Sequence, residues 1–518
     1  MWVLCLATLF FIGITHWAYR WRNPSCNGKL PPGSMGLPLL GESLQFFTPY
    51  TSSDIHPFIK QKMERYGPIF KTGFAGRPTV VSADQKFNNL IFQQEGEMFQ
   101  SWYPDTLNKI FGRQNLSSLH GFVFKYVKNM VLHMFGPEGL KRMLSELEQK
   151  ACTTLQHWSC QDTLDLSDAT KRMIFELTAK KLLSCDSKET LESLMNNFNS
   201  FMEGLISLPL NIPGTAYHKC LQGRKRAMKT LKSMLQEKRE KPRKEVSDFF
   251  DYVVEELSKE GTPLNEEMAL DLMFTLLFAS FETTSLALTY AIKALSDNPS
   301  VLKKLEEEHE GILKGREDPN SGLTWQEYKS MTFTFQVINE TIRLANIVPG
   351  IFRKTLQEIK YGGYTIPAGW AIMVCPPTVH LNPTIYEDPL SFNPSRWVGM
   401  DMSPASKHLM GFGGGIRFCV GADFAKVQMA VFLHNLVTKY RWRPIKGGNI
   451  VRNLGLRFPE GFYVRIMEKD ASKWRPIKGG NIVRNLGLRF PEGFYVRIME
   501  KDASKTPLNQ VVNHSSLC

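Results

Sequence analysis

The segment FGGGIRFCVG, Phe412–Gly421, constrains this chain more than any other. It places Cys419 at the end of a glycine-rich loop, directly before an apolar helical run, Ala422–Val437. A thiolate that binds iron needs the backbone to approach a flat cofactor closely, which glycine permits, and N–H donors that temper the charge on sulfur. The alternative is a buried structural cysteine beside a turn, the usual meaning of a lone cysteine. Because glycines and an arginine accompany Cys419 at the required spacing, we expect a thiolate ligand to iron.

This loop resembles the haem-binding signature of the cytochrome P-450 superfamily, F-x-x-G-x-R-x-C-x-G, complete and without insertion. The resemblance implies a mainly α fold with a smaller β component, the cytochrome P-450 fold. It also implies haem b, iron protoporphyrin IX, as cofactor, with the thiolate of Cys419 as the metal ligand. Arg417 is then expected to bond a haem propionate and Phe412 to shield the sulfur from water. Gly415 and Gly421 are expected to let the backbone approach the cofactor.

An acid and a base, Glu340 and Arg343, stand three residues apart in the apolar stretch FTFQVINETIRLANIV. A buried ion pair must be well satisfied or it destabilises the fold. In the family, this E-x-x-R motif joins an arginine of a later F-x-P-x-R segment, matched here by Phe392–Arg396. We expect Glu340, Arg343 and Arg396 to brace the haem-binding loop rather than to take part in chemistry. Arg353 resembles the position that bonds a second propionate, with an ordinary surface arginine as the alternative.

Two neighbouring residues, Glu282 and Thr283, place an acid beside a hydroxyl within a long apolar helix predicted over Glu266–Ser296. Oxygen activation needs two protons delivered without flooding the site with water, and such a pair can relay them. Taken alone, Thr283 is more often a threonine that bonds a helix carbonyl. The segment resembles the family pattern A/G-G-x-D/E-T-T, with Ser280 in place of the usual glycine. A serine there can bond the carbonyl a turn earlier and narrows the oxygen groove.

A third family motif, W-x-x-x-R, is matched only by Phe124 and Lys128. Phe124 cannot donate a hydrogen bond, and Lys128 replaces a bidentate guanidinium by a point charge, which puts propionate contacts at this helix in doubt. The resemblance further implies electrons from an NADPH-dependent flavoprotein reductase with an acidic docking face, and cytochrome b5 as a further partner. Lys125, Lys128 and Lys426 are candidates for the basic docking face, and an ordinary solvated face is the alternative.

The N-terminus MWVLCLATLFFIGITHWAYRWR is apolar from Trp2 to Tyr19, with Arg20 and Arg22 directly after. A cleaved signal peptide would carry basic residues before the apolar run and a small-residue cleavage site after it, and neither is visible. We therefore expect residues 1–22 to be a retained single-pass anchor, with a removed signal peptide as the alternative. The arginines place the rest of the chain in the cytosol, at the endoplasmic reticulum membrane that the resemblance implies. The nine scattered cysteines also suit a reducing compartment.

A proline-rich hinge is predicted over residues 23–40, because Pro31, Pro32 and Pro38 prevent a helix from continuing. Residues 41–473 show no break in composition and are predicted to form one haem-thiolate domain. Short β-branched and aromatic runs, 70–81 and 359–374, predict strands.

The segment 442–473 is repeated at 474–505 without a single change. In the family the C-terminal hairpin, here Leu454–Ile466, lines the substrate pocket, and one copy alone can occupy that slot. We expect the first copy to pack, because it follows the helix that ends near Tyr440, and the second to be extruded, with a disordered tail over 506–518. The second copy contributes +4 of the formal charge of +13. The chain shows no basic helix with interleaved aromatic residues. A nucleic-acid partner is therefore not expected.

The apolar segment Leu205–Pro213 is predicted to dip into the membrane beside an access channel, which favours a lipophilic substrate. The segments FASFETTS and HLNPTIYEDPLSFNPSRW resemble plant microsomal members that oxidise sterols and triterpenoids, near the brassinosteroid-type group. The resemblance implies a monooxygenase that uses NADPH and O2 for one hydroxylation or for successive oxidations. Two alternatives stay open: a haem isomerase or lyase of the same fold that needs no reductase, and a non-catalytic haem or lipid binder inactivated by the duplication.

Overall fold

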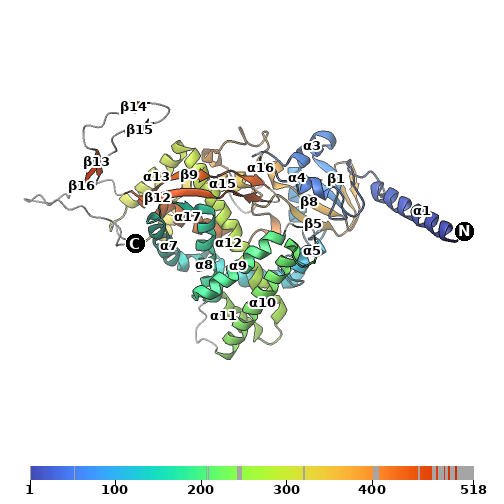
Figure 1. The fold of residues 1–518 in the computed structure, drawn as a ribbon, viewed down its shortest axis with the longest axis horizontal. Coiled ribbons are helices and arrows are strands. Elements are labelled where there is room, and N and C mark those ends of the chain that lie inside the picture. Colours follow the sequence, from blue (N-terminus) through green and yellow to red (C-terminus); the bar gives the residue numbers. More distant parts are fainter. Residues whose placement is uncertain are drawn as a thin grey trace, which may run out of the picture.

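Helix α12 (Glu266–Asp297) runs through the centre of the protein (Figure 1). The Asn265 side chain accepts a hydrogen bond from the backbone N–H of Met268 and begins the helix, and the helix ends two residues before Pro299. A helix that is apolar on nearly all sides must be surrounded by other elements, and α12 packs against α8, α10, α15 and α17. The predicted helix over Glu266–Ser296 is confirmed to within one residue.

The computed structural model describes residues 2–51, 53–205, 207, 209–241, 248–318, 321–400, 408–452 and 455–469, and the backbone of 474–476, 483–484, 488–489 and 496–498. Four predictions fall partly or wholly outside these residues. They concern the membrane-facing segment Leu205–Pro213, where residues 206 and 208 are not described, the start of the hairpin at Leu454, the extrusion of the second copy 474–505, and the tail 506–518.

Most of the remaining chain is helical, as predicted. The other α-helices are α1 (Trp2–Arg22), α2 (Ser43–Phe46), α3 (Pro57–Tyr66), α4 (Gln85–Gln93), α5 (Asp105–Phe111), α6 (Gly121–Phe135), α7 (Pro137–Ser159), α8 (Leu166–Leu183), α9 (Lys188–Leu205), α10 (Ala216–Glu240), α11 (Phe249–Leu257), α13 (Pro299–Lys314), α14 (Trp325–Ser330), α15 (Thr332–Ala345), α16 (Pro376–His380) and α17 (Ala422–Lys439). Two short 3-10 helices are η1 (Pro394–Trp397) and η2 (Gly415–Arg417).

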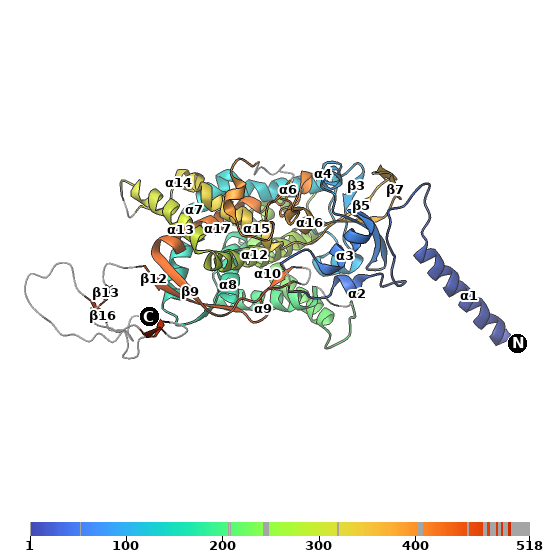
Figure 2. The same ribbon diagram turned by 90° about the horizontal axis from the view of Figure 1, so that it is seen from above.

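A smaller, sheet-containing part lies beside the helices, on the side from which α1 projects (Figure 2). Its five-stranded sheet has the order β1-β2-β8-β5-β3, in which the β2–β8 pair is parallel and the other pairs are antiparallel. The strands are β1 (Ile69–Phe74), β2 (Arg77–Ser82), β3 (Phe99–Ser101), β5 (Ile351–Thr355) and β8 (Ala371–Val374), and a separate hairpin joins β6 (Ile359–Tyr361) and β7 (Tyr364–Ile366). Both runs predicted as strands therefore contain strands.

The first copy of the repeat contributes to the folded body. Its strands β9 (Tyr440–Gly447) and β12 (Phe462–Glu468) form a three-stranded sheet with β4 (Leu164–Asp165), and β10 (Val451–Arg452) pairs with β11 (Leu456–Arg457). In the second copy, β13 (Trp474–Pro476) pairs with β16 (Val496–Ile498) and β14 (Val483–Arg484) with β15 (Leu488–Arg489). These pairs repeat the register of the first copy 32 residues later, as Trp442 opposite Ile466 becomes Trp474 opposite Ile498. The extrusion of the second copy stays a prediction.

Helix α1 carries exposed apolar side chains, among them Leu6, Leu9 and Phe10. Among the residues that the structure describes, the helix that is long and apolar enough to cross a membrane is α12. Since 61% of its most apolar window is buried inside the protein, α12 is a core helix. The anchoring role of residues 1–22 stays a prediction.

Candidate active site

The loop that carries Cys419 closes on itself before α17 begins. The backbone N–H of Cys419 donates to the carbonyl of Phe412 at 3.0 Å, and the N–H of Phe418 donates to the carbonyl of Gly415 at 3.1 Å. Gly413 and Gly415 have φ of +76° and +62°, values that residues with a Cβ rarely adopt. The backbone therefore holds the cysteine at a fixed position in front of the helix.

Two glycines of this loop are required by packing, which the sequence did not suggest. A Cβ on Gly414 would collide with the ring of Phe92, which lies in the last turn of helix α4. A Cβ on Gly415 would collide with the carbonyl oxygen of the same residue. The glycines thus let α4 pack on the loop. The prediction that Gly415 and Gly421 admit a flat cofactor is not tested by these contacts.

The thiol of Cys419 is accessible, although the surrounding protein desolvates it. Its side chain has accessible surface, yet desolvation by the surrounding protein raises the pKa of the thiol. A thiol can be both accessible and desolvated when its sulfur faces an internal space rather than bulk water. The N–H groups of Gly421 and Ala422 and the ammonium of Lys128 lower the same pKa, whereas Asp423 raises it. Because α17 begins at Ala422, the positive end of its dipole also favours a thiolate.

A second uncovered patch lies in the middle of α12, which packs against α17. Ala279 is exposed and Thr283 is half-buried, although the helix around them belongs to the core. A patch of this kind requires an open space beside the helix. The accessible thiol lies directly before α17, and the small-residue patch lies on α12, which packs against α17. We therefore assign Cys419 as the candidate ligand and the patch as the candidate distal surface.

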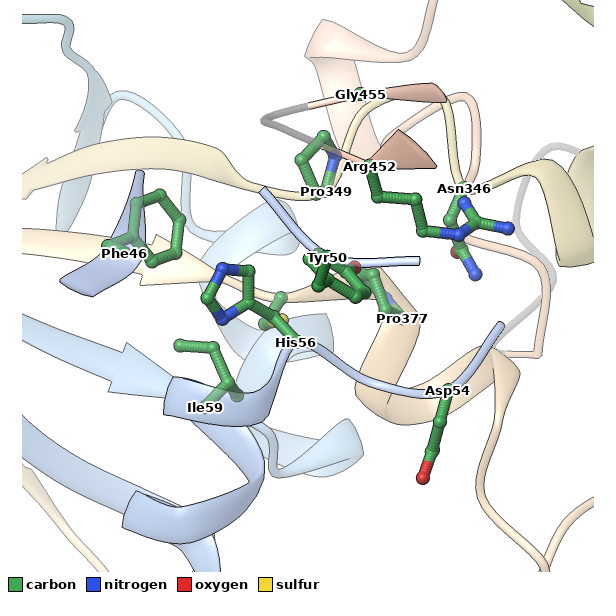
Figure 3. A pocket seen from close by; sticks show the side chains of 11 residues that line it. Phe46, Tyr50, Asp54, His56, Ile59, Asn346, Pro349, Pro377, Arg452 and Gly455 are labelled. Carbon is green, nitrogen blue, oxygen red and sulfur yellow. The ribbon is translucent and has the colours of Figure 1, made fainter. Parts of the chain in front are cut away.

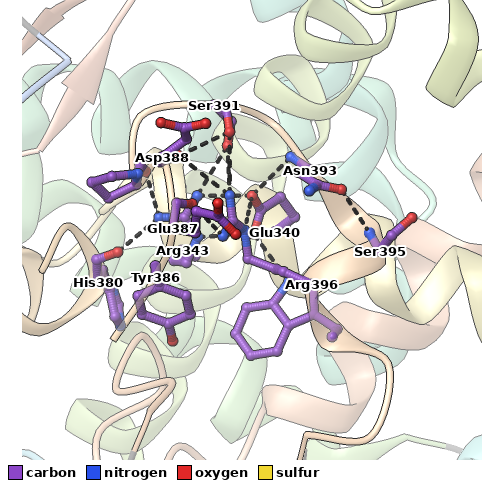
Figure 4. A network of polar contacts seen from close by, with 12 residues as sticks. Glu340, Arg343, His380, Tyr386, Glu387, Asp388, Ser391, Asn393, Ser395 and Arg396 are labelled. Atoms are coloured by element: carbon purple, nitrogen blue, oxygen red, sulfur yellow. Dashed lines mark hydrogen bonds and ion pairs between the residues drawn. The ribbon is translucent and has the colours of Figure 1, made fainter. Parts of the chain in front are cut away.

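The predicted bracing network is confirmed, and the Glu340 carboxylate at its centre is completely buried. The Glu340 carboxylate accepts hydrogen bonds from Arg343 Nε and Nη2 at 2.8 and 2.7 Å and from Arg396 Nε at 2.9 Å. It also accepts from Trp397 Nε1 and from the backbone N–H of Asn393, both at 3.0 Å (Figure 4). One carboxylate therefore joins α15 to η1 and to the segment that leads into it.

The two arginines of the network bind the backbone of the segment that precedes η1. Arg343 donates to the carbonyls of His380 and Pro389 at 2.7 and 2.6 Å, and Arg396 donates to that of Glu387 at 2.8 Å. His380 in turn accepts at Nε2 from the backbone N–H of Met410, 2.9 Å away, just before the cysteine loop. The network is thereby connected to the loop that it was expected to brace.

Arg353 and Arg417, the two predicted propionate ligands, lie close together and share an acid. Glu95 Oε2 lies 2.6 Å from Arg353 Nε, and Glu95 Oε1 accepts a hydrogen bond from Arg417 Nε at 3.0 Å. All three side chains are at least nine-tenths buried, so the alternative of a surface arginine at position 353 is wrong. Burial lowers the pKa of Arg417, and Glu95 opposes that shift.

Phe124 and Lys128 on α6 both contact the cysteine loop. The guanidinium of Arg417 lies over the ring of Phe124, 3.8 Å from its centroid. Lys128 Nζ donates to the carbonyl of Ile416 at 2.7 Å. Both residues support the loop, and the contact of Phe124 with Arg417 needs no hydrogen-bond donor at position 124.

Glu282 and Thr283 make separate contacts. The Thr283 hydroxyl donates to the carbonyl of Ala279 at 2.7 Å, and that of Ser280 donates to Leu277 at 3.1 Å, as expected for a serine at this position. Glu282 is buried and lies 3.2 Å from Nζ of Lys171 on α8. The contacts of the described residues do not join the Glu282 carboxylate to the Thr283 hydroxyl. The proton relay stays a prediction.

A separate pocket opens between α3, the C-terminal end of α15 and strand β10 (Figure 3). It encloses about 470 Å³, part of it open to solvent. Arg452, which is 4% exposed, lines it and donates to the carbonyls of Ala345 and Leu344 at 2.6 and 2.9 Å. Burial raises the pKa of the neighbouring Tyr50 to about 12. Because Arg452 belongs to the first copy of the repeat, that copy supplies a cap for α15.

The basic residues predicted to form a docking face differ in exposure. Lys125 is exposed, whereas Lys128 and Lys426 are half-buried, and burial lowers the pKa of both. The ammonium of Lys426 lies over the ring of Phe412, 5.7 Å from its centroid. Of the three candidates, Lys125 presents its charge most freely.

Several residues of the site were not found from the sequence. Glu95, Lys171 and His380 are common polar residues with no motif around them, and each acquires its role through a contact with a residue at least 30 positions away. Spacing along one element carries no signal for such contacts.

A thiol before a helix N-terminus, an uncovered patch on a central helix and a buried arginine network are the features expected of a haem-thiolate protein. A model of the cytochrome P450 family matches residues 31–463, which end within the first copy of the repeat. The computed fold resembles that of retinoic acid-bound cyanobacterial CYP120A1, with a TM-score of 0.77 and 25% identity, over 86% of this chain and 100% of the other.

Three plant relatives extend the comparison. Cytochrome P450 87A3 of Oryza sativa subsp. japonica is 57% identical over 90% of this chain and 92% of its own length. The cucurbitadienol 11-hydroxylase of Siraitia grosvenorii is 44% identical over 91% and 100%, and the cholesterol 22-hydroxylase of Paris polyphylla is 35% identical over 91% and 99%. The chain therefore belongs to the cytochrome P450 family and is a monooxygenase of that family, as the signature loop predicted.

Proposed function

We propose that this protein hydroxylates an unactivated C–H bond of a sterol- or triterpenoid-like substrate, in one step or in successive oxidations. Electrons come from NADPH through a flavoprotein reductase, and cytochrome b5 is a further partner. The observation that carries this proposal is the accessible thiol of Cys419 together with the uncovered Ala279–Thr283 patch of α12. The relatives that act on cucurbitadienol and cholesterol support the class of substrate.

Haem b, when bound through the Cys419 thiolate, supplies the centre at which O2 is reduced. The N–H groups of Gly421 and Ala422 donate hydrogen bonds to the sulfur, which lowers the pKa of the thiol against the effect of burial and would stabilise the thiolate that binds the iron. Arg417 and Arg353 are the residues that would hold the propionates, since Arg417 belongs to the cysteine loop and Arg353, on β5, binds the same acid. Phe412, whose carbonyl binds the N–H of Cys419, stands next to the sulfur in the closed loop.

Protons reach the site through α12 in this proposal. The Thr283 hydroxyl lies on the uncovered patch and donates its one proton to the Ala279 carbonyl. Its oxygen can accept a hydrogen bond at the patch as it stands, and the hydroxyl must turn away from the Ala279 carbonyl before it donates a proton there. Glu282 lies on the side of α8, 3.2 Å from Nζ of Lys171, and in this proposal its carboxylate takes up a proton there and passes it on after its side chain turns toward Thr283. Both residues are positioned on an otherwise apolar helix, which limits the entry of water.

We also place the protein on the cytosolic face of the endoplasmic reticulum, anchored by α1. The exposed apolar side chains of α1 and the arginines at its end, Arg20 and Arg22, support this orientation. Asn339 of the sequon Asn339–Thr341 is 2% exposed in the folded chain, and a lumenal protein would expose this buried segment to glycosylation while folding, which supports the cytosolic side. Lys125 on α6 is the exposed candidate for reductase docking.

Turnover with and without the reductase tests the proposal. Membranes that contain the protein and a reductase are incubated with NADPH, 18O2 and cucurbitadienol or cholesterol. We expect one 18O atom in the product and no product without the reductase. Cys419→Ser, analysed in parallel, should form no product. Conversion of a hydroperoxide without reductase or NADPH would contradict the monooxygenase assignment and favour an isomerase or lyase. Haem binding without any turnover would favour a non-catalytic binder.

A further inference from the structure

Glu95 occupies a buried position between the two arginines of the candidate cofactor site. Its carboxylate lies 2.6 Å from Arg353 Nε and 3.0 Å from Arg417 Nε, one oxygen to each guanidinium. The side chain is only 3% exposed, so solvent does not screen these interactions. Glu95 is therefore the bridge that allows two like charges to lie next to each other inside the protein.

The backbone fixes Glu95 at this position. It follows α4 in a tight turn in which Gly96 N–H donates to the carbonyl of Phe99 at 2.7 Å, the first residue of β3. Oε1 of Glu95 also accepts from the N–H of Ser101 on β3, at 2.9 Å. Ser101 is the register partner of Arg353 on β5. The acid, the strand that holds it and one arginine thus form a single unit of the sheet.

The second arginine reaches the same acid from the cysteine loop. Arg417 also donates to the carbonyl of Leu116 at 3.1 Å and of Leu119 at 2.5 Å, and it lies against the ring of Phe124. Neutral carbonyls and a ring face direct this guanidinium but supply no full negative charge. Among the described residues, the acid within ion-pair distance of both arginines is Glu95.

We propose that Glu95 is a positioning residue for the haem: it holds Arg353 and Arg417 side by side, so that the N–H groups without a protein acceptor would be directed at the two propionates. Arg417 keeps one such N–H, on Nη1, because Nε binds Glu95, Nη1 binds Leu116, and Nη2 binds Leu119 and lies 2.9 Å from His120 Nδ1. Recognition of a carboxylate by a guanidinium N–H depends on orientation, so a displaced arginine would lose the propionate even though its charge remains. Glu95 contributes a negative charge behind the arginines and does not contact the reacting atoms. The proposal rests on haem binding at Cys419 and not on the identity of the substrate.

Glu95→Gln tests the proposal, because glutamine keeps the length of the side chain and an oxygen for the Ser101 N–H but removes the charge. We expect haem transfer from the variant to apomyoglobin to be about 10- to 100-fold faster than from the wild type. We also expect a more positive haem reduction potential, because a buried negative charge stabilises the ferric state. Neither measurement requires turnover of a substrate.

Glu327→Gln is the matched control. Glu327 binds Arg316 through two hydrogen bonds, at 2.5 and 3.2 Å, on α14, without any contact to the cysteine loop. This variant should lose thermal stability but keep the wild-type rate of haem transfer and the wild-type potential. If Glu95→Gln behaves in the same way, Glu95 is only a structural residue and the proposal is wrong.

A double variant keeps the proposal testable if Glu95→Gln folds poorly. Removing Arg353 as well, in Glu95→Gln with Arg353→Gln, also removes the repulsion between the two guanidiniums. We expect the double variant to fold and to transfer haem more slowly than the product of the two single effects predicts. Additive effects, or a double variant that folds no better than Glu95→Gln, would overturn the proposed coupling.

Discussion

Glu340→Gln is the substitution that should damage the folded protein most without touching the cysteine loop. The Glu340 carboxylate is completely buried and accepts five hydrogen bonds, three of them from the guanidiniums of Arg343 and Arg396. A glutamine has one acceptor oxygen, and its NH2 group would face donors where the second carboxylate oxygen now accepts. Two buried arginines would then lose the negative charge that compensates them.

The expected loss follows from these contacts. Removing one partner of a buried ion pair costs about 3–5 kcal/mol, because the remaining charge stays buried without compensation. The hydrogen bonds from Trp397 and Asn393 end on the same carboxylate, and one of them must also break. The interactions share one acceptor, so their energies do not add, and we expect about 4 kcal/mol in total. This is a large part of the 5–15 kcal/mol typical of a whole domain.

Urea unfolding, followed by circular dichroism, measures this loss. Glu176→Gln is the control, since Glu176 forms a single, partly exposed ion pair with Lys150 at 2.7 Å, expected to contribute less than about 1 kcal/mol. Glu340→Gln should unfold at a much lower urea concentration and retain little haem. A midpoint equal to that of the control would refute the idea that this network holds the loop in place.

Three further predictions concern other parts of the chain. Burial lowers the pKa of His309 to about 3 and of His434 to about 4, so both stay neutral when folded, whereas the unfolded chain takes up protons below about pH 6.5. The free energy of unfolding is therefore highest above about pH 6.5. It falls as the pH drops toward the pKa values of the folded state, by about 1.4 kcal/mol per pH unit for each histidine. Urea midpoints at pH 7 and 5 check this, and the double variant His309→Gln/His434→Asn should flatten the dependence. Thr283→Ala should retain haem but release more hydrogen peroxide per NADPH, because the hydroxyl on the uncovered patch is lost; unchanged coupling would contradict the relay. Deletion of residues 474–518 should leave the unfolding midpoint and haem content within error of the full chain, and a loss of haem would show that the second copy supports the fold.

The elements that could be predicted from the sequence are those fixed by local patterns. Helix α12 is apolar over nearly its whole length and has an asparagine at its start and a proline after its end, so its bounds follow from the residues themselves. The Glu340–Arg343 pair could be assigned because charges in an apolar stretch need partners, and the family motif supplied Arg396. In both cases the information lies within one short segment.

Contacts between distant segments could not be predicted in the same way. Glu95 stands in the polar run FQQEGEMFQ, which is typical of an exposed turn, and it becomes buried only because β3 pairs with β5. Lys171 and Glu282 are more than 100 residues apart and meet because α8 packs on α12. Phe92 approaches Gly415 so closely that packing alone requires a glycine there. The sequence suggested only that this glycine lets the backbone approach the cofactor.

The reduced CO difference spectrum tests the central claim most directly, because it reports the thiolate itself. The full-length chain should show a Soret band at about 450 nm, and Cys419→Ser should abolish that band. Cys375→Ser is the control, since Cys375 is buried and burial raises the pKa of its thiol to about 12. A band that survives in Cys419→Ser, or one that is absent from the folded wild-type protein with bound haem, would contradict Cys419 as the iron ligand.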